Sequence, residues 1–115
     1  MNDKVEKSWG YYAVLQHLNS TVKVKELVCN PHSKLSMQRH FKRKELWFFA
    51  EGEGYINTLN NKQEIIELGK YKPFDTVIID YEQWHQLENR SNIPVKIIEI
   101  QYGHDCTEED IQRKL

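Results

Sequence analysis

The chain has 115 residues, of which 39% are apolar, and this length predicts one domain with a core of modest size. Its 16 basic and 17 acidic residues give a formal net charge of −1, which argues against a nucleic-acid or anionic-membrane partner. No apolar segment approaches the ~20 residues of a membrane-spanning helix, and the N-terminal residues MNDKVEKSWG lack the apolar part of a secretory signal.

Cys29 and Cys106 are far apart and form neither a CxxC pair nor a disulfide framework. We therefore expect a reducing, cytoplasmic location. A single bridge between the two cysteines is the alternative.

Most of the chain is expected to form β-strands. In chain order the candidate segments are residues 11–15, 22–29, 35–40, 46–49, 55–59, 63–68, 76–79 and 95–100, which are rich in apolar, β-branched and aromatic residues. Asn60-Asn61 separates two of them and predicts a hairpin. Only the end of the chain favours a helix, because Thr107 can cap a first turn that contains Glu108, Glu109 and Asp110. The pattern predicts an all-β sandwich or barrel with a short C-terminal helix.

Two of the five histidines lie among other potential metal ligands. Gln38 and His40 are two residues apart in an expected strand, so their side chains face the same way. Glu45 begins the next expected strand and His85 begins a later one, and a closed barrel can bring the four together. Two imidazoles, a carboxylate and an amide oxygen suit a divalent transition metal with positions open for a substrate. Half-buried histidines beside solvated polar residues are the alternative.

Several segments resemble the motifs of one family. LSMQRHFKRKELW at residues 35–47, followed by Gly52, resembles the first cupin motif of type II mannose-6-phosphate isomerases, and WHQLEN at residues 84–89 resembles the second. WGYY at residues 9–12 resembles the opening of these domains, and IEIQYG at residues 98–103 and EDIQR at residues 109–113 resemble their closing motifs. The chain is thus similar over nearly its whole length to the C-terminal isomerase domain of these enzymes.

This resemblance implies a cupin fold, the double-stranded β-helix or jelly-roll barrel, as a single domain over residues 1–115. It implies that Gln38, His40, Glu45 and His85 bind a divalent metal ion, with zinc expected first and iron, manganese, cobalt or nickel as alternatives. It further implies isomerisation of mannose 6-phosphate to fructose 6-phosphate through a metal-stabilised enediol. The alternatives are a non-catalytic metal- or carbohydrate-binding cupin, or another metal-dependent cupin enzyme such as an epimerase or a dioxygenase.

An isomerase also needs a base and groups that hold the substrate. Lys25 and Glu99 are the candidate bases, because both lie on strands expected to line the barrel; a rim ion pair is the alternative. The expected substrate-binding residues are Arg43, Gln101, Arg113 and Trp84, with the arginines suited to a phosphate and the indole suited to stacking on a sugar. Pairing with Glu45 is an alternative for Arg43. We expect a small sugar phosphate as the partner and a homodimer as the assembly.

Two differences from the family pattern bear on the substrate. Gln86 follows His85, where the family frequently has an arginine, and Asp80-Tyr81-Glu82 replaces a P-x-G turn. The loss of a cationic group leaves open whether the sugar carries a phosphate.

Overall fold

The computed structural model describes residues 3–114, which form twelve β-strands and no helix. The strands are β1 (Lys4–Lys7), β2 (Gly10–Asn19), β3 (Val22–Cys29), β4 (Ser33–Lys34), β5 (Met37–Arg39), β6 (Arg43–Glu51), β7 (Gly54–Leu59), β8 (Ile65–Tyr71), β9 (Thr76–Ile79), β10 (Gln86–Asn89), β11 (Val95–Gly103) and β12 (Gln112–Lys114). None of the described residues belongs to a helix that is long and apolar enough to cross a membrane.

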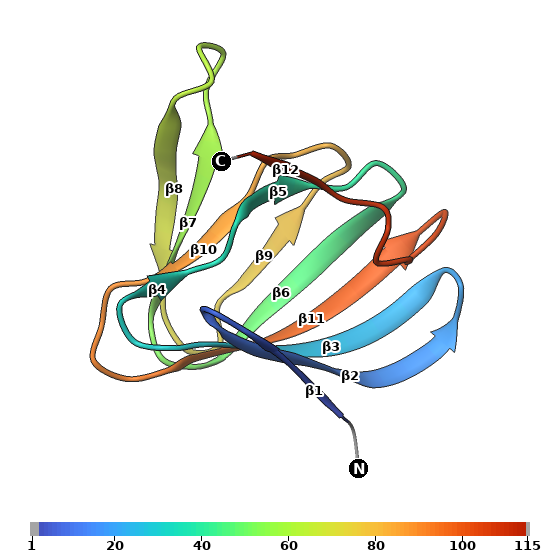
Figure 1. Cartoon of the computed structure of the whole chain (residues 1–115), viewed down its shortest axis with the longest axis horizontal. Helices are drawn as coiled ribbons and strands as arrows, with labels where there is room; N and C mark the ends of the chain where they lie inside the picture. Colours follow the sequence, from blue (N-terminus) through green and yellow to red (C-terminus); the bar gives the residue numbers. More distant parts are fainter. Residues whose placement is uncertain (1–2, 115) are drawn as a thin grey trace.

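Two antiparallel sheets enclose one interior. The larger sheet has the order β1-β2-β3-β11-β6-β9 and the smaller one β4-β10-β7-β8, while β12 pairs with β5. The backbone of Gln38, in β5, is hydrogen-bonded to that of His85, just before β10, and this bridge joins the segments that carry the first and second motifs. Figure 1 shows the sheets wrapped around the interior, with the β7–β8 hairpin projecting beyond them. The expected all-β jelly-roll barrel is confirmed.

The inward faces of the central strands divide the interior into an apolar and a polar half. In β6, the buried positions change from Arg43 and Glu45 to Trp47 and Phe49. In the antiparallel β11, Gln101 lies opposite Glu45, whereas Ile97 lies opposite Phe49. Because neighbouring strands match polar with polar and apolar with apolar positions, each half is continuous across the sheet.

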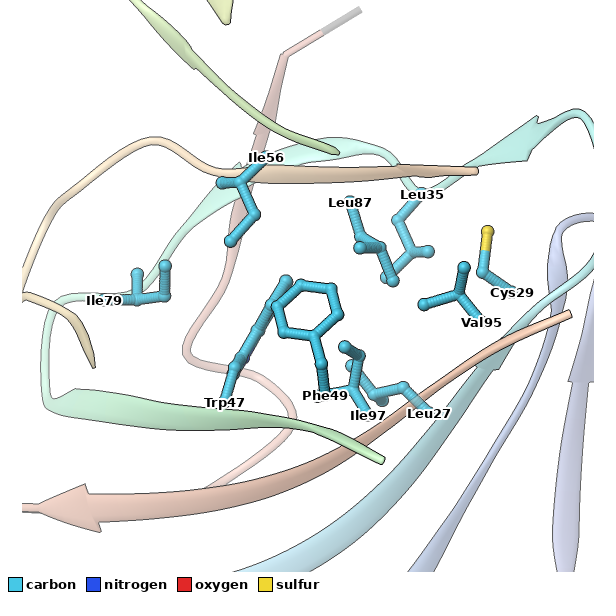
Figure 2. Close-up of a cluster of buried hydrophobic side chains, with 10 residues drawn as sticks. All are labelled: Leu27, Cys29, Leu35, Trp47, Phe49, Ile56, Ile79, Leu87, Val95 and Ile97. Carbon is cyan, nitrogen blue, oxygen red and sulfur yellow. The ribbon is translucent and has the colours of Figure 1, made fainter. Parts of the chain in front are cut away.

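The apolar half forms the hydrophobic core. Its buried members come from both sheets and are Leu27, Cys29, Leu35, Trp47, Phe49, Ile56, Ile79, Leu87, Val95 and Ile97. Figure 2 shows Trp47 and Phe49 between the side chains of the two sheets. The rings of Phe49 and Tyr71 stack with centroids 5.4 Å apart. Cys29 and Cys106 are both buried and free.

The predicted C-terminal helix is wrong. The backbone oxygen of Thr107 accepts a hydrogen bond from Arg43 Nη1 (2.9 Å), and that of Asp110 accepts one from His40 Nδ1 (2.7 Å). The Asp110 carboxylate accepts hydrogen bonds from the backbone nitrogens of Phe41 and Lys42 (3.0 and 2.8 Å). These contacts with the barrel replace the local hydrogen bonds of a helix, so tertiary structure overrides a weak local preference.

Gly10 is required where β2 passes β3. Its φ is +145°, and a Cβ atom there would lie 1.9 Å from the carbonyl oxygen of Val28. We expect Gly10→Ala to lower the free energy of unfolding by about 2 kcal/mol or more, because the overlap is with backbone rather than with a flexible side chain. Urea titration followed by tryptophan fluorescence measures the change.

Gly69→Ala is the matched control, because a Cβ atom at Gly69 meets only the side chain of Tyr71, at 3.1 Å or more. Equal losses of stability in the two variants would contradict the explanation given for Gly10.

Candidate metal centre

Three potential metal ligands meet in the polar half of the barrel. His40 follows β5, Glu45 lies in β6 and His85 precedes β10, and one ligand atom from each lies within 4.8 Å of the other two. Glu45 Oε2 is 3.3 Å from His40 Nε2, and Glu45 Oε1 is 3.5 Å from His85 Nε2. All three residues are at most 3% exposed. A buried carboxylate between two imidazoles offers the nitrogen and oxygen ligands that divalent transition metals bind.

Hydrogen bonds to backbone oxygens orient both imidazoles. His40 Nδ1 lies 2.7 Å from the carbonyl oxygen of Asp110, and His85 Nδ1 lies 2.8 Å from that of Gln83. Because a carbonyl only accepts hydrogen bonds, each Nδ1 carries a proton, and each Nε2 faces Glu45. Two imidazole nitrogens and a carboxylate that face one another need positive charge between them, so this donor set fits a cation.

Arg43 supplies part of that positive charge. Its Nε donates to Glu45 Oε2 (3.0 Å), its Nη2 to His40 Nε2 (3.2 Å) and its Nη1 to the backbone oxygen of Thr107 (2.9 Å). The side chain is buried. The guanidinium therefore orients two candidate ligands, and its three bonded nitrogens are not available at the cavity mouth.

The protonation states of the three ligands follow from burial and charge. Burial lowers the pKa of His40 to about 4, with a further contribution from Arg43, so its imidazole is neutral at pH 7. Burial alone would raise the pKa of the Glu45 carboxyl, but the His85 hydrogen bond and the neighbouring positive charges hold it well below its usual range. Burial alone would lower the pKa of His85, yet Glu45 raises it. Glu45 and His85 therefore each favour the charged form of the other.

Gln38 lies beside this triad. Two backbone hydrogen bonds join Gln38 to His85 (3.0 and 2.9 Å), and its side chain borders the same cavity. Its Nε2 donates to Ser36 Oγ (3.2 Å), which leaves the amide oxygen as the atom suited to a metal.

A cavity of about 720 Å³ opens onto these ligands, with Glu99 and Gln101 in its wall. Trp47 Nε1 donates to both Glu45 Oε1 (3.1 Å) and Glu99 Oε2 (2.9 Å), and Gln101 Nε2 donates to Glu99 Oε1 (2.7 Å). Burial, and then the charge of Glu45, raises the pKa of Glu99 to about 8. Gln101 Oε1 is buried without a hydrogen-bond partner in the described part of the chain, so it can accept a hydrogen bond from a ligand.

The other expected site residues are more dispersed. Lys25 lies opposite Glu99 across the sheet, but its ammonium is bonded to Glu108 (3.1 Å). Trp84 is not among the described residues that line the cavity, and its ring stacks with the Arg39 guanidinium at 4.7 Å. Arg113 does line the cavity.

The sequence did not point to Glu108 as a site residue. Its carboxylate accepts hydrogen bonds from the ammonium groups of Lys25 (3.1 Å) and Lys23 (3.3 Å). The only feature of the sequence that marks Glu108 is the run of acidic residues at 108–110, and this run favoured the start of a helix.

The sequence family described as Mannose-6-phosphate isomerase C-terminal matches residues 1–114. The alginate biosynthesis protein AlgA of Pseudomonas aeruginosa is 30% identical over 112 residues, which cover 96% of this chain and 21% of AlgA. A mannose-1-phosphate guanylyltransferase of Salmonella muenchen is 30% identical over 110 residues, which cover 96% of this chain and 22% of that enzyme. The chain thus spans about a fifth of the length of these relatives.

Solved structures share the fold. The capsular polysaccharide assembling protein CapF of Staphylococcus aureus has a TM-score of 0.83 at 17% identity, over 98% of this chain and 32% of CapF. Oxalate decarboxylase of Bacillus subtilis, a protein with Mn(II) centres, has a TM-score of 0.79 at 15% identity, over 96% of this chain and 29% of that one. At these identities the similarity establishes the cupin fold alone.

Arg43 gives a prediction about the metal-free protein. After dialysis against a chelator, we expect Arg43→Met to lower the free energy of unfolding by roughly 3–5 kcal/mol, because it leaves the buried Glu45 without its arginine partner. Urea titration measures the loss. Arg39→Met is the control, since the Arg39 guanidinium lies over the rings of Phe41 and Trp84. A loss below about 1 kcal/mol in Arg43→Met would contradict this role.

Glu108 gives a prediction about pH. Burial would raise the pKa of its carboxyl, but Lys25 and Lys23 lower it, so the stabilisation is complete above the usual glutamate range and is lost as pH falls through the lowered value. We expect Glu108→Gln to be less stable by roughly 0.5–1 kcal/mol at pH 7. The difference should narrow between about pH 5 and pH 3.

Urea titrations across this pH range measure the effect, with Glu109→Gln as the neighbouring control. A difference that stays constant with pH would show that the ion pairs of Glu108 do not cause it.

Proposed function

Because the chain belongs to the mannose-6-phosphate isomerase C-terminal family, we propose that it is a metal-dependent aldose–ketose isomerase that converts mannose 6-phosphate to fructose 6-phosphate. One observation carries the proposal: the buried triad of His40, Glu45 and His85 opens into a cavity whose wall holds a second carboxylate, Glu99. That arrangement provides ligands for a cation and a candidate base in one enclosed space.

His40, Glu45 and His85, with Gln38 as a fourth ligand, would hold the ion. Two nitrogens and two oxygens are compatible with zinc, the first expectation, and with manganese, iron, cobalt or nickel. A divalent ion bound there would supply positive charge that stabilises the negative charge developing on the sugar oxygens. The backbone carbonyls of Asp110 and Gln83 hold the imidazoles in the tautomer that such binding needs.

Glu99 is the base that the geometry favours. Its Oε2 and the Glu45 carboxylate share the Trp47 indole N–H, so Glu99 lies beside the ligands. A carboxyl with a pKa of about 8 can take up a proton near neutral pH and release it again. Glu99 would remove the proton from C2 of the sugar and return it to C1, while a hydroxyl proton passes from O2 to O1. The Lys25 ammonium is bonded to Glu108, which makes Lys25 the weaker candidate.

A second candidate function is sugar binding without catalysis. Gln86 favours it, because its side chain donates to the backbone oxygen of Leu35 (2.9 Å) and accepts from Asn57 (3.1 Å). An amide thus fills the position after His85 and brings no positive charge to it.

Proton NMR of mannose 6-phosphate in D₂O tests the isomerase proposal. The sugar phosphate is incubated with protein that has been loaded with zinc, manganese or cobalt, and the protein is removed before the spectra are recorded. We expect deuterium at C2 and the appearance of fructose 6-phosphate. The control is the double variant His40→Ala, His85→Ala. Absence of both deuterium exchange and fructose 6-phosphate in folded protein with measured metal content would contradict the proposal and favour the binding function.

Glu99→Gln tests the base. We expect kcat to fall by roughly 10²–10⁴-fold with metal content unchanged, because the amide keeps the hydrogen-bonding shape but cannot accept the proton. Coupled assay of fructose 6-phosphate formation measures the rate, with Glu53→Gln on the surface as the control. A loss smaller than about tenfold would remove Glu99 from this role.

A further inference from the structure

The wall of the cavity carries positive charge that the proposed metal ligands and base do not use. Its basic residues are Lys7, Lys25, Lys34, Arg43 and Arg113. They come from β1, β3, β4, β6 and β12, so segments distant in the sequence contribute to one opening.

Two of these five residues are bonded to carboxylates, and a third, Lys34, faces one across the smaller sheet. Arg43 is buried and bonded to Glu45, His40 and Thr107. Lys25 is bonded to Glu108. Lys34 lies opposite Glu88 in the smaller sheet, where the hydrogen bond from Arg90 lowers the pKa of that carboxyl most and the charge of Lys34 adds to the effect.

Lys7 and Arg113 remain. Within residues 3–114, neither has a carboxylate oxygen within 4.0 Å. Arg113 is in register with Gln38, whose side chain borders the cavity, and residues paired in this way share one face of the sheet. Both cations are exposed and therefore accessible to a ligand entering from solvent.

Tyr12 lies near the first of these cations. The Lys7 ammonium is 5.9 Å from the centroid of its ring. Burial and the charge of Glu108 raise the pKa of the Tyr12 phenol, and Arg113, which lines the same cavity, opposes them. Tyr12 also lines the cavity, so its hydroxyl can donate to an anion held by the two cations.

We propose that Lys7, Tyr12 and Arg113 form a subsite for the phosphate group of the substrate. The subsite deepens the proposed function and rests on it for the identity of the sugar. The proposed metal ligands and base occupy the inner end of the cavity, whereas the mouth offers two cations and a hydroxyl to a dianion. This polarity orients a sugar phosphate with its phosphate at the mouth and its uncharged end at Glu99 and the metal ligands.

Calorimetric titration with mannose 6-phosphate, inorganic phosphate and mannose tests the subsite on metal-loaded protein. In the double variant Lys7→Ala, Arg113→Ala we expect the Kd of mannose 6-phosphate to rise about 30-fold or more, because two charge-assisted contacts are lost. Binding of inorganic phosphate should weaken as well, and Tyr12→Phe should weaken both more modestly. The double variant Lys62→Ala, Lys72→Ala removes two positive charges elsewhere and should change neither affinity by more than about twofold.

The outcomes separate the subsite from the isomerase activity. If the double variant Lys7→Ala, Arg113→Ala binds phosphate more weakly and the wild type shows no turnover, the subsite is upheld and the isomerase proposal is contradicted. Turnover with a KM that the variant leaves unchanged would uphold the isomerase and overturn the subsite. Failure of the wild type to bind either phosphate, or equal losses in the Lys62, Lys72 control, would also overturn it.

Discussion

The buried carboxylate of Glu45 is the constraint on which the arrangement of the site depends. An ionised carboxylate that is only 2% exposed has lost its hydration and needs donors and positive charge from the protein. Arg43 and the Trp47 indole provide hydrogen bonds, and the two imidazoles lie on either side. In the same arrangement, Nε2 of each imidazole faces an oxygen of the Glu45 carboxylate. The arrangement that stabilises this charge is therefore also one that can bind a divalent metal ion.

The sheet register places this charge away from the hydrophobic core. In β3 and β11, as in β6, inward positions are polar at one end and apolar at the other, and antiparallel pairing aligns the polar ends. Lys25 thus lies opposite Glu99, and Leu27 opposite Ile97. The apolar rows pack between the two sheets and hold the strands, so the polar rows can form a cavity without collapsing onto one another. The same chain provides a rigid framework and an open, charged site.

The strands and the candidate ligands could be predicted from the sequence, whereas the loop contacts could not. Alternating apolar residues identified most strands, and motif spacing identified His40, Glu45 and His85, because both depend on local patterns. The segment around Thr107 and Asp110 is held by bonds to Arg43, His40 and the Phe41–Lys42 backbone, which are about 65 to 70 residues away and leave no local signal. The same holds for the contact of Trp84 with Arg39 and for Lys7, which only the closed barrel brings to the cavity, whereas Arg113 was expected there from its motif.

Metal content is the most direct test of the central claim that the buried triad is a metal centre. The purified protein should be analysed by elemental mass spectrometry, stripped with a chelator, and titrated with zinc and manganese by calorimetry. We predict one divalent ion per chain in the wild type and loss of this binding in Glu45→Gln, with the variant's fold confirmed by circular dichroism. Wild-type protein that is folded and binds none of these ions, or a Glu45→Gln variant that binds them with unchanged affinity, would contradict the account.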